Sequence, residues 1–293
     1  MTTARSVGAG SAPTQSTVVR SLAKRVAFAI DDVASHDVGT VILAYHRVGG
    51  HTVSPVDLDR RSFRRQMAHV RAVRRAISLD TFADQVASAN PVEGRPQTPE
   101  VFAQDVVLTF DDGTADFVDE VMPVLVEYQL PATLYVATMN VDTGQSFPGG
   151  ANPISWNGLR DAVATGLVTI GAHTHTHRLL DRCSLEEIRG ELDRSNGRIE
   201  EELGSRPAHF AYPKAVPASG RLDVEVMARY KTAAVAGTRP NVAGKTNLHR
   251  LRRSPIQVAD GWEGFRRKLH GGMRAEDDLR RWINKYRYRA LRS

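Results

Sequence analysis

The sequence has very little cysteine and no long hydrophobic run. Cys183 is the only cysteine among the 293 residues, so neither an internal disulfide nor a thiolate metal cluster can form. The apolar segment 41–45 runs directly into His46 and Arg47, and no stretch approaches the roughly 20 apolar residues that span a bilayer. These absences exclude a disulfide-stabilised scaffold and a membrane-spanning helix.

The N-terminal segment, residues 1–17, is small and polar. It lacks the apolar core of about 7 to 15 residues that a secretory signal requires. We therefore expect a disordered leader here, and a protein that works in the cytoplasm or at the cytoplasmic face of the membrane.

Positive charge is concentrated at the C-terminal end. The chain carries 39 Lys and Arg against 33 Asp and Glu, a net charge of +6. Residues 264–293 alone hold 10 basic and 3 acidic side chains, so the rest of the chain is almost neutral. A nucleic-acid-binding body would spread its positive charge more widely, and no nucleic-acid motif accompanies it, so we expect no nucleic-acid partner.

The C-terminal extension, residues 261–293, interleaves basic side chains with aromatic ones such as Trp262, Phe265 and Trp282. One interpretation is a terminal helix that packs its apolar face on the preceding domain. The other is peripheral contact of its basic face with an anionic membrane or polymer.

The predicted organisation is a leader (1–17), a single domain (18–260) that opens with an amphipathic helix, and this helical extension.

Segments typical of strands and helices alternate along the single domain. Their order over about 200 residues is typical of a parallel α/β fold, either an open sheet or a barrel. The functional site of such a fold lies at the carboxyl ends of its strands. The predicted strands are 41–45, 105–110, 132–137, 168–172, 209–212 and 232–236, and the predicted helices are 18–33, one from about 62, 115–129, 156–165, 185–203 and 224–230.

Aspartate and histidine gather at the predicted carboxyl ends of the strands. Asp111 and Asp112 follow one strand directly, and two adjacent carboxylates repel each other unless a cation lies beside them. His173 and His177 follow another strand, and their spacing lets them converge on one ion if the chain turns into a helix there. With one carboxylate they would form a three-ligand metal site with open positions for water. We expect His175, between them, to point away.

Several motifs together make the sequence resemble the polysaccharide deacetylase family. They are T-F-D-D-G at residues 109–113, H-T-H-T-H at 173–177, which matches H-[ST]-x-x-H, and F-A-Y-P at 210–213. Y-H-R-V at 45–48 is similar to the opening of the branch that includes the poly-N-acetylglucosamine deacetylases. The family shares the NodB homology domain and forms carbohydrate esterase family 4. The resemblance spans about residues 41–256.

The resemblance implies a distorted (β/α) barrel with fewer than eight regular strands, flanked here by terminal helices. It also implies a divalent metal, usually zinc, with cobalt, nickel or manganese as alternatives. Carried over residue by residue, Asp112, His173 and His177 would be the ligands and Asp111 the general base.

Further roles follow from the same resemblance. The backbone N–H of Tyr212 would stabilise the oxyanion. His46 would be the general acid that protonates the departing amine, and His249, in an L-x-H motif, is the alternative. Arg250 or Arg253 could orient Asp111, although a run of basic residues is more often a solvated face.

The implied reaction is removal of N-acetyl groups from a glycan, one that contains N-acetylglucosamine. The alternatives are an O-acetyl esterase or non-sugar amidase that uses the same site, or a catalytically weak carbohydrate-binding protein on the same fold. The presence of both aspartates and both histidines argues against the binding protein. Trp156 is interpreted as a core residue, and the loop 142–152, with Phe147, as a segment that could close over substrate.

Overall fold

The structure is a computed structural model, and it describes residues 38–49, 52–88, 104–217 and 223–279. The predicted leader, the predicted helix 18–33 and the end of the C-terminal extension, 280–293, lie outside the described residues. No helix within the described ranges is both long and apolar enough to cross a membrane.

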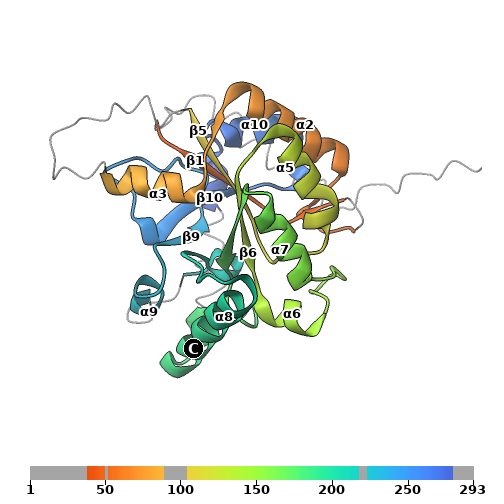
Figure 1. The fold of residues 1–293 in the computed structure, drawn as a ribbon. Helices are drawn as coiled ribbons and strands as arrows, with labels where there is room; N and C mark the ends of the chain where they lie inside the picture. Colours follow the sequence, from red (N-terminus) through yellow and green to blue (C-terminus); the bar gives the residue numbers. More distant parts are fainter. Residues whose placement is uncertain (1–37, 50–51, 89–103, 218–222, 280–293) are drawn as a thin grey trace, which may run out of the picture.

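Seven parallel strands close into a barrel, because β1 (Val41–Tyr45) pairs with both β10 (Leu251–Pro255) and β5 (Asp105–Phe110) (Figure 1). This settles the choice between an open sheet and a barrel. A short strand, β4 (Arg75–Ala76), pairs with the start of β5, and β2 (Arg47–Val48) with β3 (Asp57–Leu58) forms a separate pair. The barrel strands are β1 (Val41–Tyr45), β5 (Asp105–Phe110), β6 (Ala132–Val136), β7 (Val168–Ala172), β8 (His209–Ala211), β9 (Thr232–Ala236) and β10 (Leu251–Pro255).

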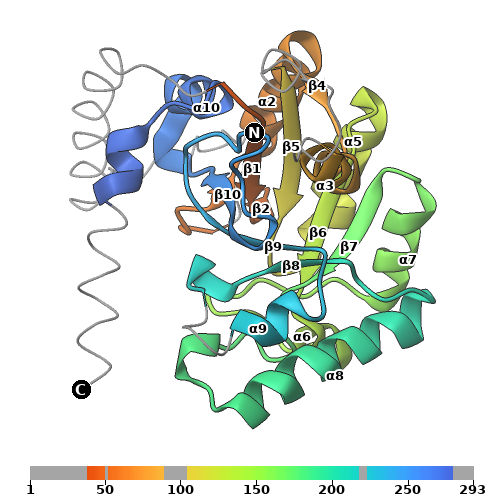
Figure 2. The same cartoon turned by 90° about the vertical axis from the view of Figure 1, so that its left-hand side faces the viewer.

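Helices surround the barrel, and each strand presents alternate side chains to them and to the barrel interior. In β1, for example, Leu43 and Tyr45 pack in the large outer core, whereas Ile42 packs in the smaller inner core. The surrounding helices are α2 (Arg60–Val73), the π-helix η1 (Phe117–Val121), α5 (Met122–Tyr128), α6 (Thr138–Thr143), α7 (Trp156–Ala164), α8 (Leu185–Leu203), α9 (Asp223–Met227) and α10 (Gly261–Leu269) (Figures 1 and 2).

The longest of these helices, α8, begins and ends where its sequence indicates. Ser184 and Glu187 form a capping box at its N-terminus, in which each side chain accepts from the other residue's backbone N–H. Gly204 ends it in the left-handed conformation, which glycine adopts without a steric penalty. The predicted helix 185–203 therefore has the bounds observed.

The predicted helix 115–129 is present in a different form. Residues 117–121 make a π-helix, in which the Met122 N–H donates to the Phe117 carbonyl, before the regular helix α5 begins. Pro123 has no N–H to give to the carbonyl four residues earlier, so the ladder of helical hydrogen bonds is interrupted at this point.

Two elements outside the predicted set complete the barrel. α3 (Leu79–Ser88) contributes Leu79, Phe82 and Val86 to the inner core. β10 carries the sequence L-R-R-S-P, which lacks the apolar character of the other strands. Its inward residue Arg253 is buried because Asp111, a carboxylate of the barrel interior, neutralises it.

The start of the C-terminal extension belongs to the helical layer. α10 buries Phe265 and Leu269 in the outer core and packs against α2 and β1. Trp262 lies beside this core, with the guanidinium of Arg65 3.9 Å from its ring centroid. The apolar face of the extension thus packs on the domain over residues 261–269.

Candidate active site

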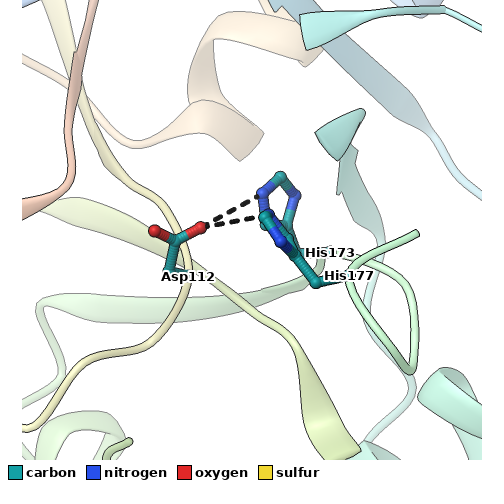
Figure 3. A group of neighbouring side chains, drawn as sticks. All are labelled: Asp112, His173 and His177. Carbon is teal, nitrogen blue, oxygen red and sulfur yellow. Dashed lines mark ion pairs between the residues drawn. The ribbon is translucent and has the colours of Figure 1, made fainter. Parts of the chain in front are cut away.

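Asp112, His173 and His177 come together at the carboxyl ends of β5 and β7 (Figure 3). Asp112 Oδ1 lies 3.6 Å from His173 Nε2 and 3.3 Å from His177 Nε2. One ligand atom of each residue lies within 4.8 Å of the other two. A tetrahedral zinc ion with bonds of about 2.0–2.2 Å would hold its ligand atoms about 3.4 Å apart. The two nitrogens and the carboxylate oxygen therefore fit a divalent ion.

The two histidines converge through an irregular loop, which corrects the predicted helical turn. No helix covers residues 173–177, and the chain bends there instead at Thr174 (φ 65°) and His177 (φ 57°), both in the left-handed region. Asp112 is left-handed as well (φ 73°). Such conformations cost about 1–2 kcal/mol for residues other than glycine. Two of the three proposed ligands, Asp112 and His177, therefore have a strained backbone, as is common at functional sites.

A carbonyl group fixes the tautomer of His173. Its Nδ1 lies 2.7 Å from the Ala211 carbonyl oxygen, which can only accept a hydrogen bond, so Nδ1 carries the proton. Nε2, with its lone pair, then faces Asp112. Burial lowers the pKa of His173 to about 4, so the ring is neutral at physiological pH. A neutral imidazole is the form that binds a metal.

Asp112 stays ionised although its side chain is only 20% exposed. Burial would raise its pKa. The hydrogen bond with His177 and the electrostatic effect of the three nearby histidines outweigh this effect and hold the pKa well below its ordinary value. An anionic oxygen thus faces two imidazole nitrogens. Gly113 follows in the left-handed region (φ 83°), and a Cβ there would lie 2.9 Å from Val136 Cγ1, so the close approach of the loop to β6 requires glycine.

Asp111 is held by Arg253, which is only 2% exposed. The guanidinium donates from Nη1 to Oδ1 at 2.5 Å and from Nη2 to Oδ2 at 2.8 Å. Burial opposes ionisation, but the charge of Arg253 keeps the pKa of Asp111 below its ordinary value. The interpretation of this basic run as a solvated face is wrong for Arg253. Arg250 instead pairs with Asp223, away from Asp111.

His46 lies beside Asp111, and His249 does not. His46 follows β1 at the carboxyl end of the barrel, with Nε2 3.8 Å from Asp111 Oδ2 and a side chain 27% exposed. His249 precedes β10 and is therefore at the amino end, where its Nε2 lies 2.9 Å from the Tyr230 carbonyl oxygen. The alternative assignment of the general acid to His249 does not fit this arrangement.

The backbone N–H of Tyr212 already takes part in a hydrogen bond. It donates to the Ala234 carbonyl oxygen at 3.1 Å, because the pairing of β8 with β9 continues one residue beyond Ala211. The tyrosine side chain is buried, and its hydroxyl donates to Asp223. The oxyanion-stabilising role predicted for this N–H is therefore not supported, since the hydrogen is already used within the sheet.

Neighbouring side chains enclose the histidine tract. Phe147 is 6% exposed, and its ring lies perpendicular to that of His177 with centroids 6.4 Å apart. His175 points away from His173 and His177, as expected, and its Nδ1 lies 2.9 Å from Thr138 Oγ1. Trp156 packs beside the outer core and donates from Nε1 to Asp142, in agreement with a core role. No sequence motif indicated the contact between Phe147 and His177.

Comparison with known proteins identifies the domain. Residues 100–233 match the family model described as polysaccharide deacetylase. No curated protein sequence matches the chain at a significant level.

Several solved structures share the fold. IcaB from Ammonifex degensii is 22% identical with a TM-score of 0.66, and the match covers 80% of this chain and 98% of that one. The deacetylase PplD of Streptococcus pyogenes, in complex with acetate, is 21% identical with a TM-score of 0.64, over 80% and 99% of the two chains. A de-N-acetylase from Aggregatibacter actinomycetemcomitans is 17% identical with a TM-score of 0.61, over 78% and 99%.

These matches confirm the family resemblance and the barrel. At such identities the solved structures establish the shared fold, and residues 100–233, which include Asp111, Asp112, His173 and His177, match the family model. The chain therefore contains a polysaccharide deacetylase domain of the NodB type, the domain of hydrolases that remove acetyl groups from glycans.

Proposed function

We propose that this protein is a metal-dependent hydrolase that removes N-acetyl groups from a glycan containing N-acetylglucosamine. The observation that carries the proposal is the convergence of Asp112, His173 and His177 beside a second, differently held carboxylate, Asp111. One carboxylate faces the two imidazoles, while the other contacts Arg253 and lies near His46. This separation gives two adjacent aspartates two different roles.

The three proposed ligands suit a divalent ion of the zinc type. They offer two neutral nitrogens and one carboxylate oxygen, a set that leaves coordination positions for water and substrate. When bound, such an ion polarises a carbonyl group and lowers the pKa of water to about 7. Cobalt, nickel and manganese accept the same kinds of ligand atom.

Asp111 is the proposed general base. Because Arg253 keeps it ionised, it is ready to accept a proton from the attacking water at neutral pH. The two hydrogen bonds also fix the orientation of the carboxylate. The arrangement exchanges some basicity for this fixed orientation, since a low pKa weakens a base.

His46 is the proposed general acid. Cleavage of an amide releases an amine, which is a poor leaving group until its nitrogen is protonated. His46 Nε2 lies 3.8 Å from Asp111 Oδ2, the oxygen that also accepts from Arg253 Nη2, and the His46 side chain is 27% exposed. A histidine in this position can donate its proton to the nitrogen and recover one from solvent.

Acetate release from chito-oligosaccharides by the zinc-loaded protein tests the proposal. Asp111→Asn should keep the metal content of the parent and lose turnover by about 100-fold or more, because no base takes the proton of the attacking water. His173→Ala should lose the metal as well, measured by elemental analysis. Turnover by Asp111→Asn at the rate of the parent would show that the assignment of the base is wrong.

Substrates with different leaving groups test both the acid role of His46 and the substrate class. His46→Ala should slow an N-acetyl substrate more than an activated acetyl ester, whose leaving group needs no proton. Equal slowing of both would argue against an acid role for His46. Release of acetate from acetylated xylan but not from chito-oligosaccharides would support the O-acetyl esterase instead.

A further inference from the structure

Residues 174–176, which connect the two histidine ligands, are held by side chains and backbone groups of two helices. From α6, the Met139 N–H donates to the His175 carbonyl oxygen at 2.9 Å, and Thr138 Oγ1 contacts the His175 ring. From α8, a single carboxylate holds Thr176. α6 and α8 also contact each other, so the connecting segment lies against a packed pair of helices (Figure 1).

The α8 carboxylate is that of Glu191, which is 2% exposed. Its Oε2 accepts the backbone N–H of Thr176 at 2.8 Å, and its Oε1 accepts the Thr176 hydroxyl at 2.8 Å. The guanidinium of Arg194 is more distant, with Nη2 4.0 Å from Oε1. Both oxygens of a buried carboxylate are thus used to hold the one residue that precedes His177.

The two histidine ligands differ in how they are oriented. The ring of His173 is fixed by the Ala211 carbonyl. No acceptor for Nδ1 of His177 is found among the residues that the structure describes, and the side chain is 23% exposed. The backbone of His177 is left-handed, a conformation that its own Cβ disfavours. The ring contacts Phe147 and His173, and its backbone conformation depends on its neighbours along the chain.

We propose that Glu191 is a positioning residue for the metal centre: by holding both donors of Thr176, it keeps His177 in the left-handed conformation that directs Nε2 at Asp112. This inference rests on the proposed function, since it requires that Asp112, His173 and His177 bind a metal. Without the carboxylate, the backbone between the two histidines relaxes and one of three ligands leaves its place. Groups that orient metal ligands typically change affinity by about 10- to 100-fold when removed.

The test measures the zinc and cobalt affinities of the full chain by competition with a chromogenic chelator. Glu191→Ala should weaken both affinities about 10- to 100-fold. Thr176→Val, which keeps the N–H but loses the hydroxyl, should weaken them less, and Thr176→Ser, which keeps both donors, should restore the parent value. Glu200→Ala, at an exposed position of the same helix, is the matched control and should change nothing.

A double variant separates positioning from general destabilisation. Because Thr176 acts through Glu191, Glu191→Ala with Thr176→Val should bind metal no more weakly than Glu191→Ala alone. Circular dichroism of the metal-free variants reports folding. If Glu191→Ala does not fold, Glu191→Gln, which keeps the shape but not the charge, should show a several-fold loss of affinity.

Two results would overturn the inference, and only one of them would also overturn the proposed metal site. A parent that binds neither metal would overturn the metal site and this inference together. A parent that binds zinc, with folded Glu191→Ala or Glu191→Gln variants that bind it within about twofold of the parent, would overturn only the role of Glu191. The absorption spectrum of bound cobalt should also change in Glu191→Ala if the position of His177 changes.

Discussion

Arg253 and Asp111 show how one residue sets the chemistry of another inside the barrel. Arg253 is 2% exposed and Asp111 5% exposed, and two hydrogen bonds join them. A carboxylate buried without a partner would become protonated near neutral pH. The arginine therefore keeps the proposed base in its active, ionised form.

Replacement of this arginine should change the pH dependence of the reaction. In Arg253→Met, burial acts on Asp111 without the opposing charge, so the pKa of Asp111 rises. Since the base must be ionised, the ascending limb of kcat/KM against pH should move to higher pH. Breaking a buried ion pair also costs about 3–5 kcal/mol of folding stability, measurable by urea denaturation.

Arg253→Lys is the matched control for charge. It keeps a cation near Asp111 and should move the ascending limb less than Arg253→Met does. A pH profile that is the same in Arg253→Met and in the parent would show that Asp111 does not titrate in the rate-determining step.

At the scale of elements, a hydrogen bond joins the segment that carries His46 to the start of η1. The Val48 N–H, in β2, donates to Asp116 Oδ2 at 2.7 Å. Burial raises the pKa of Asp116, against the hydrogen bond from the Val48 N–H. This contact joins the segment after β1, with the proposed acid, to the segment after β5, with Asp111 and Asp112.

Loss of this hydrogen bond should affect the position of His46 more than the binding of the metal. Asp116→Ala should lower kcat/KM for an N-acetyl substrate about 10-fold or more, because His46 is no longer held in position, while the zinc content stays that of the parent. Asp116→Asn keeps an oxygen that accepts the Val48 N–H and should remain within a few-fold of the parent. Full activity in Asp116→Ala would mean that the packing of β2 alone positions His46.

At the scale of the whole molecule, burial of His173 makes the stability of the metal-free protein depend on pH. Burial lowers the pKa of His173 to about 4 in the folded chain, against an ordinary value of 6.5. Between these values the unfolded chain binds a proton that the folded chain does not. Stability should therefore fall as the pH drops from about 6.5 to about 4, by up to about 3 kcal/mol from this residue.

Urea denaturation of the metal-free protein at several pH values in this range measures the effect. His173→Asn has no such group, so its free energy of unfolding should fall less over the same range. Other histidines, such as His175, whose pKa burial also lowers, contribute equally to both proteins and cancel in the comparison. Parallel curves for the two proteins would contradict the assignment to His173.

Much of this architecture could be predicted from local patterns. The strands 41–45, 105–110, 168–172 and 232–236 have the predicted bounds, because short apolar and β-branched segments in a parallel barrel are buried on both sides. α3 was missed although Leu79, Phe82 and Val86 recur at helical spacing. β10 could not be predicted in this way, since an arginine becomes a core residue only where a distant carboxylate meets it.

The sequence by itself determined the alternation of strands and helices, and with it the carboxyl-end positions of His46, Asp111, Asp112 and the histidine tract. Only the tertiary structure decided which groups meet. It placed His249 at the opposite end of the barrel, engaged the Tyr212 N–H with Ala234, and paired Arg253 with Asp111. Strand and helix patterns are local, whereas these contacts depend on barrel closure, which joins residues as far apart as 111 and 253.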